Sequence, residues 1–328
     1  MNGCRQMKSI IGCIVFALCL ASHVAKGQLF VPADTFRQGR AIAITGTGLA
    51  VYSGGMYLLG KAWYKDNLTN SFKFFNDNGE WLQMDKVGHV FSAYNEAGFV
   101  HDLYRSAGVR ERKALWLGIG AGLLAQTSIE IFDGFSDRWG FSWGDVAGNF
   151  AGLALFGFQQ AAWHEQKLKL KVSSDFRSYS TSDILPLSGS ESDNLHRRAG
   201  ELFSNNLAGR LLKDYNAQTY WLSFSPADFS SQRFWPAWLD ISIGYSGENL
   251  FGGYGNTWDY QGNTYQLSGR DFPRYRQFLL SLDLDLTRIP CRSAFLRDVF
   301  RVLNIIKIPA PTLELNSLGK LKGHWIYF

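Results

Sequence analysis

Residues 278–286 read Phe-Leu-Leu-Ser-Leu-Asp-Leu-Asp-Leu, and every second side chain from Phe278 to Leu286 is apolar. Successive side chains of a strand point to opposite faces of a sheet, so this period of two predicts a half-buried β-strand. Residues 239–245 alternate in the same way, and shorter candidates cover residues 220–224, 313–316 and 323–328. These segments predict a small antiparallel sheet that packs against helices.

The first half of the chain has a different pattern. Residues 41–60 contain no charged side chain and are bounded by Arg40 and Lys61, with Trp63 and Tyr64 just outside. That length and those flanks are typical of a transmembrane or deeply buried helix. Further helices are expected at residues 85–106, 111–132, from Ser142 onward, 197–215 and 293–307. The predicted fold class is therefore α+β, an N-terminal antiparallel helical bundle followed by a small antiparallel β-rich domain.

The N-terminus has the three parts of an export signal. Arg5 and Lys8 precede an unbroken apolar run at residues 10–21, and Ala25-Lys26-Gly27 offers small residues for cleavage. We therefore expect residues 1–27 to be a signal peptide and Gln28 to be the new N-terminus. Cys13 lies before most of the apolar run rather than after it, which argues against lipid attachment at that cysteine. After cleavage only Cys291 remains, so no internal disulfide is possible.

Composition limits the classes of function. Without the signal, 30 basic residues stand against 28 acidic ones, which is too balanced for a nucleic-acid-binding protein. Aromatic residues make up 15% of the chain, and tryptophan and tyrosine favour membrane interfaces. The expected partners are a membrane and other envelope proteins, with no nucleic acid. The expected location is the periplasm or the membrane-associated cell envelope, and the choice between inner and outer membrane stays open.

A polar, serine- and aspartate-rich segment separates two parts of the mature chain. It predicts a helical domain at residues 28–165, a linker or exposed loop at 166–196, and a helix plus β-rich domain at 197–328. A comparison with outer-membrane barrels starts from the terminal Phe328, but the residues at alternate positions before it include His324, Lys322 and Lys320. The number of candidate strands is also smaller than the number that the smallest closed barrel needs, which is about eight. A self-contained barrel is therefore not expected.

Small residues recur every four positions on two of the helices. They are Ala114, Gly118 and Gly122 on one helix and Gly144, Gly148 and Gly152 on the next. Such a ridge allows helices to approach closely, so we expect these two helices to form a tight antiparallel hairpin.

Polar side chains of three helices converge if these helices run up, down and up. The start of the second helix, the end of the third and the start of the fourth then meet at one end of the bundle. The predicted cluster consists of Asp85, His89, Glu130, Asp133, Asp145 and Asn149.

Two interpretations of this cluster stay open. In the structural one, Ser142 and Asp145 cap a helix, and Lys86 or Arg138 neutralises the acids. In the functional one, carboxylates and an imidazole bind a cation or a polar ligand. The other histidines (His101, His164, His196 and His324) are expected at the surface. No phosphate-binding loop, zinc-protease helix or nucleophile elbow occurs in the sequence.

The order Asp85-Lys86-x-x-His89, Glu130-x-x-Asp133 and Ser142-x-x-Asp145-x-x-x-Asn149-x-x-Gly152 resembles a known pattern. It is similar to the YfiM-like family of predicted periplasmic lipoproteins, and more weakly to VanZ-like membrane proteins. The match spans about residues 81–160. Residues 213–223 and the strand around residues 282–285 resemble longer members from Bacteroidetes-type bacteria.

The YfiM-like resemblance implies a location and a helical fold but no reaction and no cofactor. The expected function is an envelope protein of structural or binding type. The alternative is a metal-dependent or acid–base envelope enzyme that acts on a lipid- or cell-wall-derived substrate.

Overall fold

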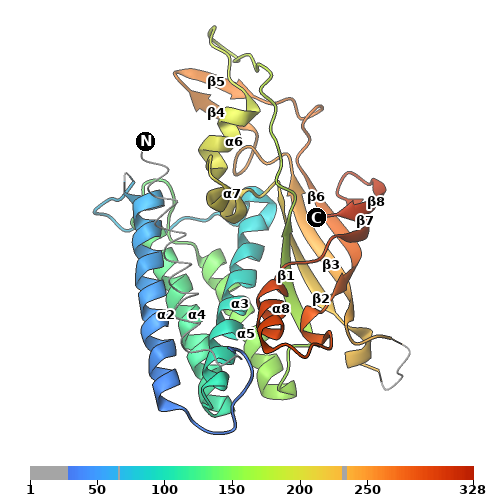
Figure 1. Ribbon diagram of the computed structural model, residues 1–328. Helices are drawn as coiled ribbons and strands as arrows, with labels where there is room; N and C mark the ends of the chain where they lie inside the picture. The colour runs from blue at the N-terminus through green and yellow to red at the C-terminus, as the bar shows by residue number, and fades with distance from the viewer. Residues whose placement is uncertain (1–28, 66, 231–234) are drawn as a thin grey trace. The chain divides into compact units, whose positions relative to one another are not determined.

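The computed structural model describes residues 29–65, 67–230 and 235–328, so the predicted signal peptide lies outside the described residues. Long helices precede a sheet of antiparallel strands, which confirms the α+β fold class (Figure 1). The chain divides into two compact units that exchange segments along the sequence. The first comprises residues up to Lys73, Glu96–Phe141 and Pro290–Val302, and the second comprises Phe74–Asn95, Ser142–Ile289 and Leu303–Phe328.

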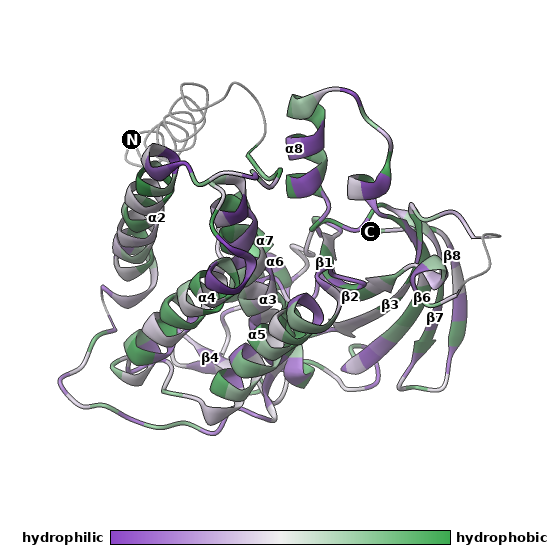
Figure 2. Ribbon diagram, turned by 90° about the horizontal axis from the view of Figure 1, so that it is seen from below, coloured by the Kyte–Doolittle hydropathy of each residue, from purple (hydrophilic) through white to green (hydrophobic). Residues whose placement is uncertain are grey.

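The first unit contains two long apolar helices, α2 (Gln38–Leu59) and α4 (Glu111–Gly134). Both are long and apolar enough to cross a membrane by length and composition. The apolar stretch of α2 is not buried at any point, and the hydrophilic residues of α2 gather at the start of the helix (Figure 2). Tyr52 of α2 and Ser128 of α4 are joined by a hydrogen bond of 2.6 Å between their hydroxyls.

Glycines determine which helices touch, and the observed partners differ from the predicted ones. A Cβ on Gly118 of α4 would lie 2.4 Å from the carbonyl oxygen of Ala97, in the second half of α3 (Met84–Ser106). A Cβ on Gly152 of α5 (Trp143–Trp163) would lie 2.2 Å from the carbonyl oxygen of Val90, in the first half of α3. Both glycine ridges therefore pack against α3, whereas the sequence predicted that they would pack against each other. The spacing reveals a smooth ridge but not the identity of its partner.

The second unit contains a six-stranded antiparallel sheet in the order β1-β2-β3-β6-β7-β8. The strands are β1 (Leu168–Ser174), β2 (Gln218–Phe224), β3 (Leu239–Glu248), β6 (Tyr275–Leu284), β7 (Ala310–Asn316) and β8 (Leu321–Tyr327). The separate hairpin of β4 (Thr257–Tyr260) and β5 (Asn263–Gln266) lies in the loop that joins β3 to β6. Within the described ranges, β1 and β8 do not pair with each other, so the sheet is not a closed barrel.

The buried side of this sheet is the polar side. On β6 the buried side chains include Gln277, Ser281 and Asp283, while Phe278, Leu280 and Leu282 are exposed. The alternation correctly predicted strands, but the face that hydrophobicity would normally bury is the one left bare on β3, β6 and β7. The apolar face is covered at β1 and β2, where Phe91 of α3 lies 5.5 Å from Tyr220, measured between ring centroids. It is also covered at the end of β3, where Tyr245 packs beside Met84 and donates a hydrogen bond to Leu82.

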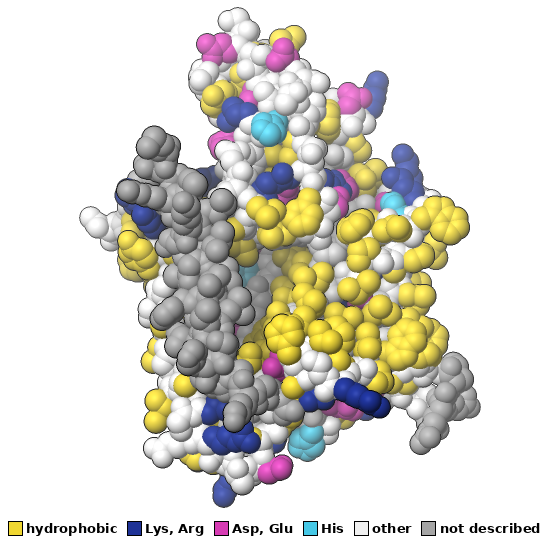
Figure 3. Space-filling view, viewed as in Figure 1, with side chains coloured by type: hydrophobic (Ala, Val, Ile, Leu, Met, Phe, Trp, Pro, Cys, Tyr) yellow, Lys and Arg dark blue, Asp and Glu magenta, His cyan; other side chains and the backbone are white. Residues whose placement is uncertain are grey.

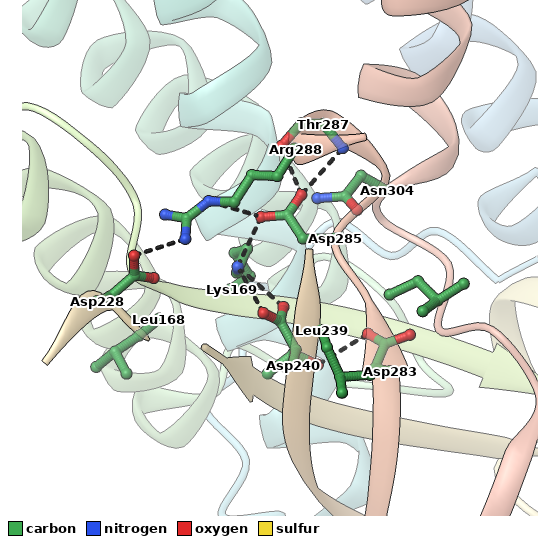
Figure 4. A network of polar contacts seen from close by, with 12 residues as sticks. Leu168, Lys169, Asp228, Leu239, Asp240, Asp283, Asp285, Thr287, Arg288 and Asn304 are labelled. Carbon is green, nitrogen blue, oxygen red and sulfur yellow. Dashed lines mark hydrogen bonds and ion pairs between the residues drawn. The ribbon is translucent and has the colours of Figure 1, made fainter. Parts of the chain in front are cut away.

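Ion pairs fill the polar side (Figure 4). Lys169 contacts Asp240 and Asp285 at 2.9 and 2.7 Å, and Lys171 contacts Asp283 at 2.7 Å. The side chain of Lys171 is 0% exposed, and its ammonium also donates to the carbonyl oxygen of Leu284 at 2.8 Å and to Asn304 at 3.2 Å, so its buried donors have partners. Burial raises the pKa of Asp240 to about 6 despite the neighbouring Lys169.

The sheet curls around this polar side. Trp221 of β2 and Tyr327 of β8 lie four strands apart in the sheet order, yet their ring centroids are 6.0 Å apart. The segment before β7 closes part of the opening, because the amide of Val172 donates to Ile305 and that of Lys307 donates to Val172. The polar side is therefore the interior of a curled sheet, and the apolar side is its outer surface.

Two segments differ from the predicted secondary structure. The expected linker at residues 166–196 contains β1, whose alternating leucines and lysines follow the period of two within an otherwise polar segment. The expected helix at residues 197–215 is two helices, α6 (Leu195–Phe203) and α7 (Leu207–Lys213). Ser204 between them has a φ of 82°, and the side chain of Asn206 caps α7 by accepting from the amide of Gly209. The short amphipathic helix near the C-terminus is α8 (Ala294–Leu303).

Candidate functional site

The first turns of α3 and α5 bring polar side chains together in the second unit. The hydroxyl of Ser142 accepts a hydrogen bond of 3.1 Å from the amide of Asp145, which is the cap expected from the sequence. The same hydroxyl donates to Asp77 at 2.5 Å. A single serine therefore starts α5 and also fixes an acidic residue from the loop before α3.

A left-handed turn leads into α3. Trp81, Leu82 and Gln83 have φ values of 49°, 52° and 64°, a conformation that costs residues with a Cβ about 1 kcal/mol or more each. The turn is held from outside, because the amide of Trp81 donates to Gly253 at 2.8 Å and Arg276 donates to Gln83 at 2.6 Å. This strained segment fixes the direction in which α3 presents Asp85 and its neighbours.

Lys86 is the centre of the cluster. Its ammonium lies 2.7 Å from Asp77, 2.6 Å from Asp145 and 3.6 Å from Asp85. The side chain is 14% exposed, and that of Asp145 is 7% exposed, so these charges are largely removed from water. One ammonium cannot neutralise three carboxylates, and the cluster keeps an excess of negative charge.

This excess changes the acidities. Burial and the charge of Asp85 raise the pKa of Asp145 to about 7. Burial would also raise the pKa of Asp77, but the hydrogen bonds from Lys86 and Ser142 hold it below its ordinary value. Burial would lower the pKa of Lys86, yet the surrounding carboxylates raise it, so we expect the ammonium to stay charged.

His89 lies one helical turn after Asp85 and faces α5. Its Nδ1 is 3.0 Å from the side-chain oxygen of Asn149, and its Nε2 is 3.7 Å from Asp145. The ligand atoms of Asp85, His89 and Asp145 all lie within 4.8 Å of one another, close enough to hold one metal ion. The positively charged ammonium of Lys86 lies beside these three side chains, 2.6 Å from Asp145.

Two tyrosines close the side of the cluster that faces the sheet. The hydroxyl of Tyr215 donates to Asp85 at 2.5 Å, and burial together with the charge of Asp85 raises the pKa of Tyr215 well above its ordinary value. A Cβ added to Gly88 would lie 2.9 Å from the hydroxyl oxygen of Tyr220, which is closer than normal van der Waals contact. A larger residue at Gly88 would displace it.

The remaining predicted residues lie in the other unit. Glu130 is fully buried, and Asp133 accepts a hydrogen bond of 2.7 Å from the hydroxyl of Tyr64. The guanidinium of Arg138 lies 5.5 Å from the ring centroid of Trp139. The second unit thus brings together Asp85, Lys86, His89, Asp145 and Asn149. That Glu130 and Asp133 join them stays a prediction.

Sequence reasoning missed several members of the cluster. Asp77 was unnoticed because it lies in a polar turn, Asn76-Asp77-Asn78-Gly79, that by itself indicates only a loop. Tyr215 lies in the segment 213–223, which resembles longer family members but contains no pattern that predicts a chemical role.

The position of His101 also differs from the prediction. His101 was expected at the surface, yet it is 4% exposed, and its ring nitrogens lie 3.0 Å from Asp102 and 2.8 Å from Glu111.

Comparison with known proteins gives one match. Residues 73–161 match the model of a family described as "Predicted periplasmic lipoprotein (DUF2279)". The match covers about a quarter of the chain and includes the starts of both α3 and α5. No curated protein and no solved structure is significantly similar to the chain. The description confirms the expectation of an exported, envelope-associated protein.

Proposed function

We propose that this protein is embedded in an envelope membrane and has a structural or binding role. The observation that carries the proposal is the exposure of α2. Ile42, Leu49, Val51 and Tyr57 are each more than half exposed, and the apolar window of the helix has no buried part. A helix that is apolar all round and bare is stable in lipid but unfavourable in water.

The contacts between helices support the same proposal. Besides the Tyr52–Ser128 pair, the hydroxyls of Thr45 and Tyr104 lie 2.8 Å apart. Hydroxyl pairs of this kind hold helices together where hydrocarbon offers no alternative partner. The resemblance to YfiM-like and VanZ-like proteins agrees with an envelope role and supplies no reaction.

Within this proposal, the Lys86 cluster is a structural junction. It connects the first turn of α3, the first turn of α5, the loop that contains Asp77 and the segment that contains Tyr215. Each carboxylate in it has a partner on a different segment, which is the arrangement expected of an internal brace.

Site-specific labelling tests the membrane proposal. Cys291→Ser would remove the one cysteine of the mature chain, and Val51→Cys or Thr69→Cys would then add a single thiol. A water-soluble maleimide applied to membranes should label the loop position Thr69 and spare Val51 until detergent is added. Equal labelling of both positions in intact membranes would show that α2 lies in water and would overturn the proposal.

A second candidate role, binding of a divalent cation, is favoured by the closeness of Asp85, His89 and Asp145. Calorimetric titration with Zn²⁺ tests it on the purified protein. Saturable binding that is lost in His89→Ala and kept in the exposed control His196→Ala would support it. Equal heats in both variants would leave only the structural role.

A further inference from the structure

The outer surface of the curled sheet is bare and apolar over four strands. The large exposed side chains on it are Ile243, Phe278, Leu280, Leu282, Leu313, Leu315, Leu321 and Trp325. Register places them in rows that cross the strands, because Ile243 pairs with Leu280 and Leu280 pairs with Leu313. Figure 3 shows hydrophobic side chains gathered over the strand-rich part of the molecule.

This surface contains a hollow of about 640 Å³. Leu280, Leu282 and Leu313 contribute to its lining, together with Trp235 and Trp325. Trp325 is 90% exposed, an extreme value for the largest apolar side chain. Tryptophan is enriched where proteins meet the boundary between hydrocarbon and water.

The interior of the sheet explains why this surface cannot be turned inward. Lys169, Lys171, Asp240 and Asp283 are buried on the opposite face and are paired there with one another or with Asp285. A shift of strand register by one residue would turn the apolar side chains into the polar interior and would break every one of these ion pairs. The alternation with polar residues inside and apolar residues outside is that of strands that face lipid.

The chemistry of the surface selects its partner. On this face of β6 the charged group is the guanidinium of Arg276, which already donates to the hydroxyl of Tyr245 at 3.1 Å and to Gln83 at 2.6 Å. The exposed side chains named above carry no charge, and their polar group is the indole of Trp325. A protein interface of this size carries about one hydrogen bond per 100–200 Å², which these side chains do not provide. Hydrocarbon needs none. The exposed Lys320 adjoins the surface at Leu321, where its ammonium group can reach anionic headgroups, whereas Lys322 pairs with Glu314 and belongs to the polar face.

We infer that the outer face of β3, β6, β7 and β8 is a lipid-binding surface that rests in the hydrocarbon of a bilayer, with acyl chains in the hollow beside Trp325. The inference rests on the proposed membrane association, but it concerns a different unit of the chain from α2. It adds a second membrane contact, made by strands.

Quenching by lipid tests the inference on the full chain. The Cys291→Ser protein with one added cysteine is labelled with an environment-sensitive fluorophore and reconstituted into vesicles of phosphatidylethanolamine and phosphatidylglycerol. The positions are Leu313→Cys on the sheet, Val51→Cys on α2 and the exposed Thr257→Cys on the separate hairpin. Lipids that carry a nitroxide on the acyl chain supply the quencher, and circular dichroism checks that each variant is folded.

We expect the Leu313 label to be quenched as strongly as the Val51 label, and the Thr257 label to keep its fluorescence. Quenching at Val51 without quenching at Leu313 would overturn the inference and leave the proposed function intact. Quenching at Leu313 alone would support the inference and refute the role of α2. A Leu313 label that is neither quenched nor reached by a water-soluble quencher would mean that protein covers the sheet, which also overturns the inference.

Discussion

Replacing Lys86 by methionine should destabilise the second unit more than any surface change. The substitution keeps the length of the side chain but removes an ammonium that lies 2.6 Å from Asp145 and 2.7 Å from Asp77. Breaking a buried ion pair from one side costs about 3–5 kcal/mol, because the remaining charge stays buried without its partner. The side chain of Lys86 is 14% exposed, so partial hydration places the expected loss near the lower end, about 3 kcal/mol.

The measurement is the free energy of unfolding of the purified protein in detergent, followed by circular dichroism in increasing denaturant. Lys320→Met removes an exposed lysine in a turn and should change this free energy by no more than about 0.5 kcal/mol. Lys86→Arg keeps the positive charge and should recover part of the loss.

A second substitution makes the test sharper. Once Lys86 is methionine, an ionised Asp145 repels Asp77 and Asp85 in a poorly hydrated site. At a pH well above 7, where Asp145 is ionised, adding Asp145→Asn should therefore restore stability in that background. In the wild-type chain the same Asp145→Asn change removes a partner of Lys86, so it should raise the free energy of unfolding less than it does in the methionine variant. If Lys86→Met costs less than about 1 kcal/mol, or if Asp145→Asn makes the methionine variant still weaker, Lys86 is not the charge that holds the cluster together.

Three further outcomes are expected. The pKa of Asp145 is raised to about 7 in the folded protein from an ordinary 3.8, so the folded state binds more protons than the unfolded state between these values. The contribution of Asp145 to stability should therefore fall, by an amount on the order of a few kcal/mol, as pH rises from about 4 to 7. Unfolding measured across that range should show a shallower fall in Asp145→Asn, and an identical slope would contradict the assignment. Gly152→Ala should lower the melting temperature and cost about 1–3 kcal/mol, because its Cβ would meet the α3 backbone, whereas Gly120→Ala, with open space around it, should be neutral or stabilising. Mass spectrometry of the mature protein should find Gln28 at the N-terminus, and a lipid on Cys13 would refute the predicted processing.

The sequence by itself determined the long helices and the strands that alternate strictly, although it missed β1 and did not separate α6 from α7. A charge-free run bounded by Arg40 and Lys61 is sufficient to predict α2, and strict alternation around Leu282 is sufficient to predict β6, because both signals come from the local geometry of the chain. It also determined the starts of α3 and α5 and the helix cap at Ser142. The polar residues at these starts, His89 and Asp145 among them, could therefore be named in advance.

Only the tertiary structure decided what these elements face. The glycine ridge that contains Gly152 could pack on any smooth helix, and its partner α3 depends on the path of the whole chain. Asp77 and Tyr215 lie 8 and 130 residues from Asp85, and neither belongs to a pattern that a local reading can detect.

The sheet shows most clearly what the sequence pattern alone could not decide. Alternation around Leu282 states that two faces differ, but which face is buried depends on what lies against each one. Here Lys169 and Lys171 come from β1, in a segment expected to be a linker, and they neutralise Asp240 and Asp283 inside the curl. Because the charges that make a polar interior stable come from distant parts of the chain, no single strand could reveal that its leucines point outward.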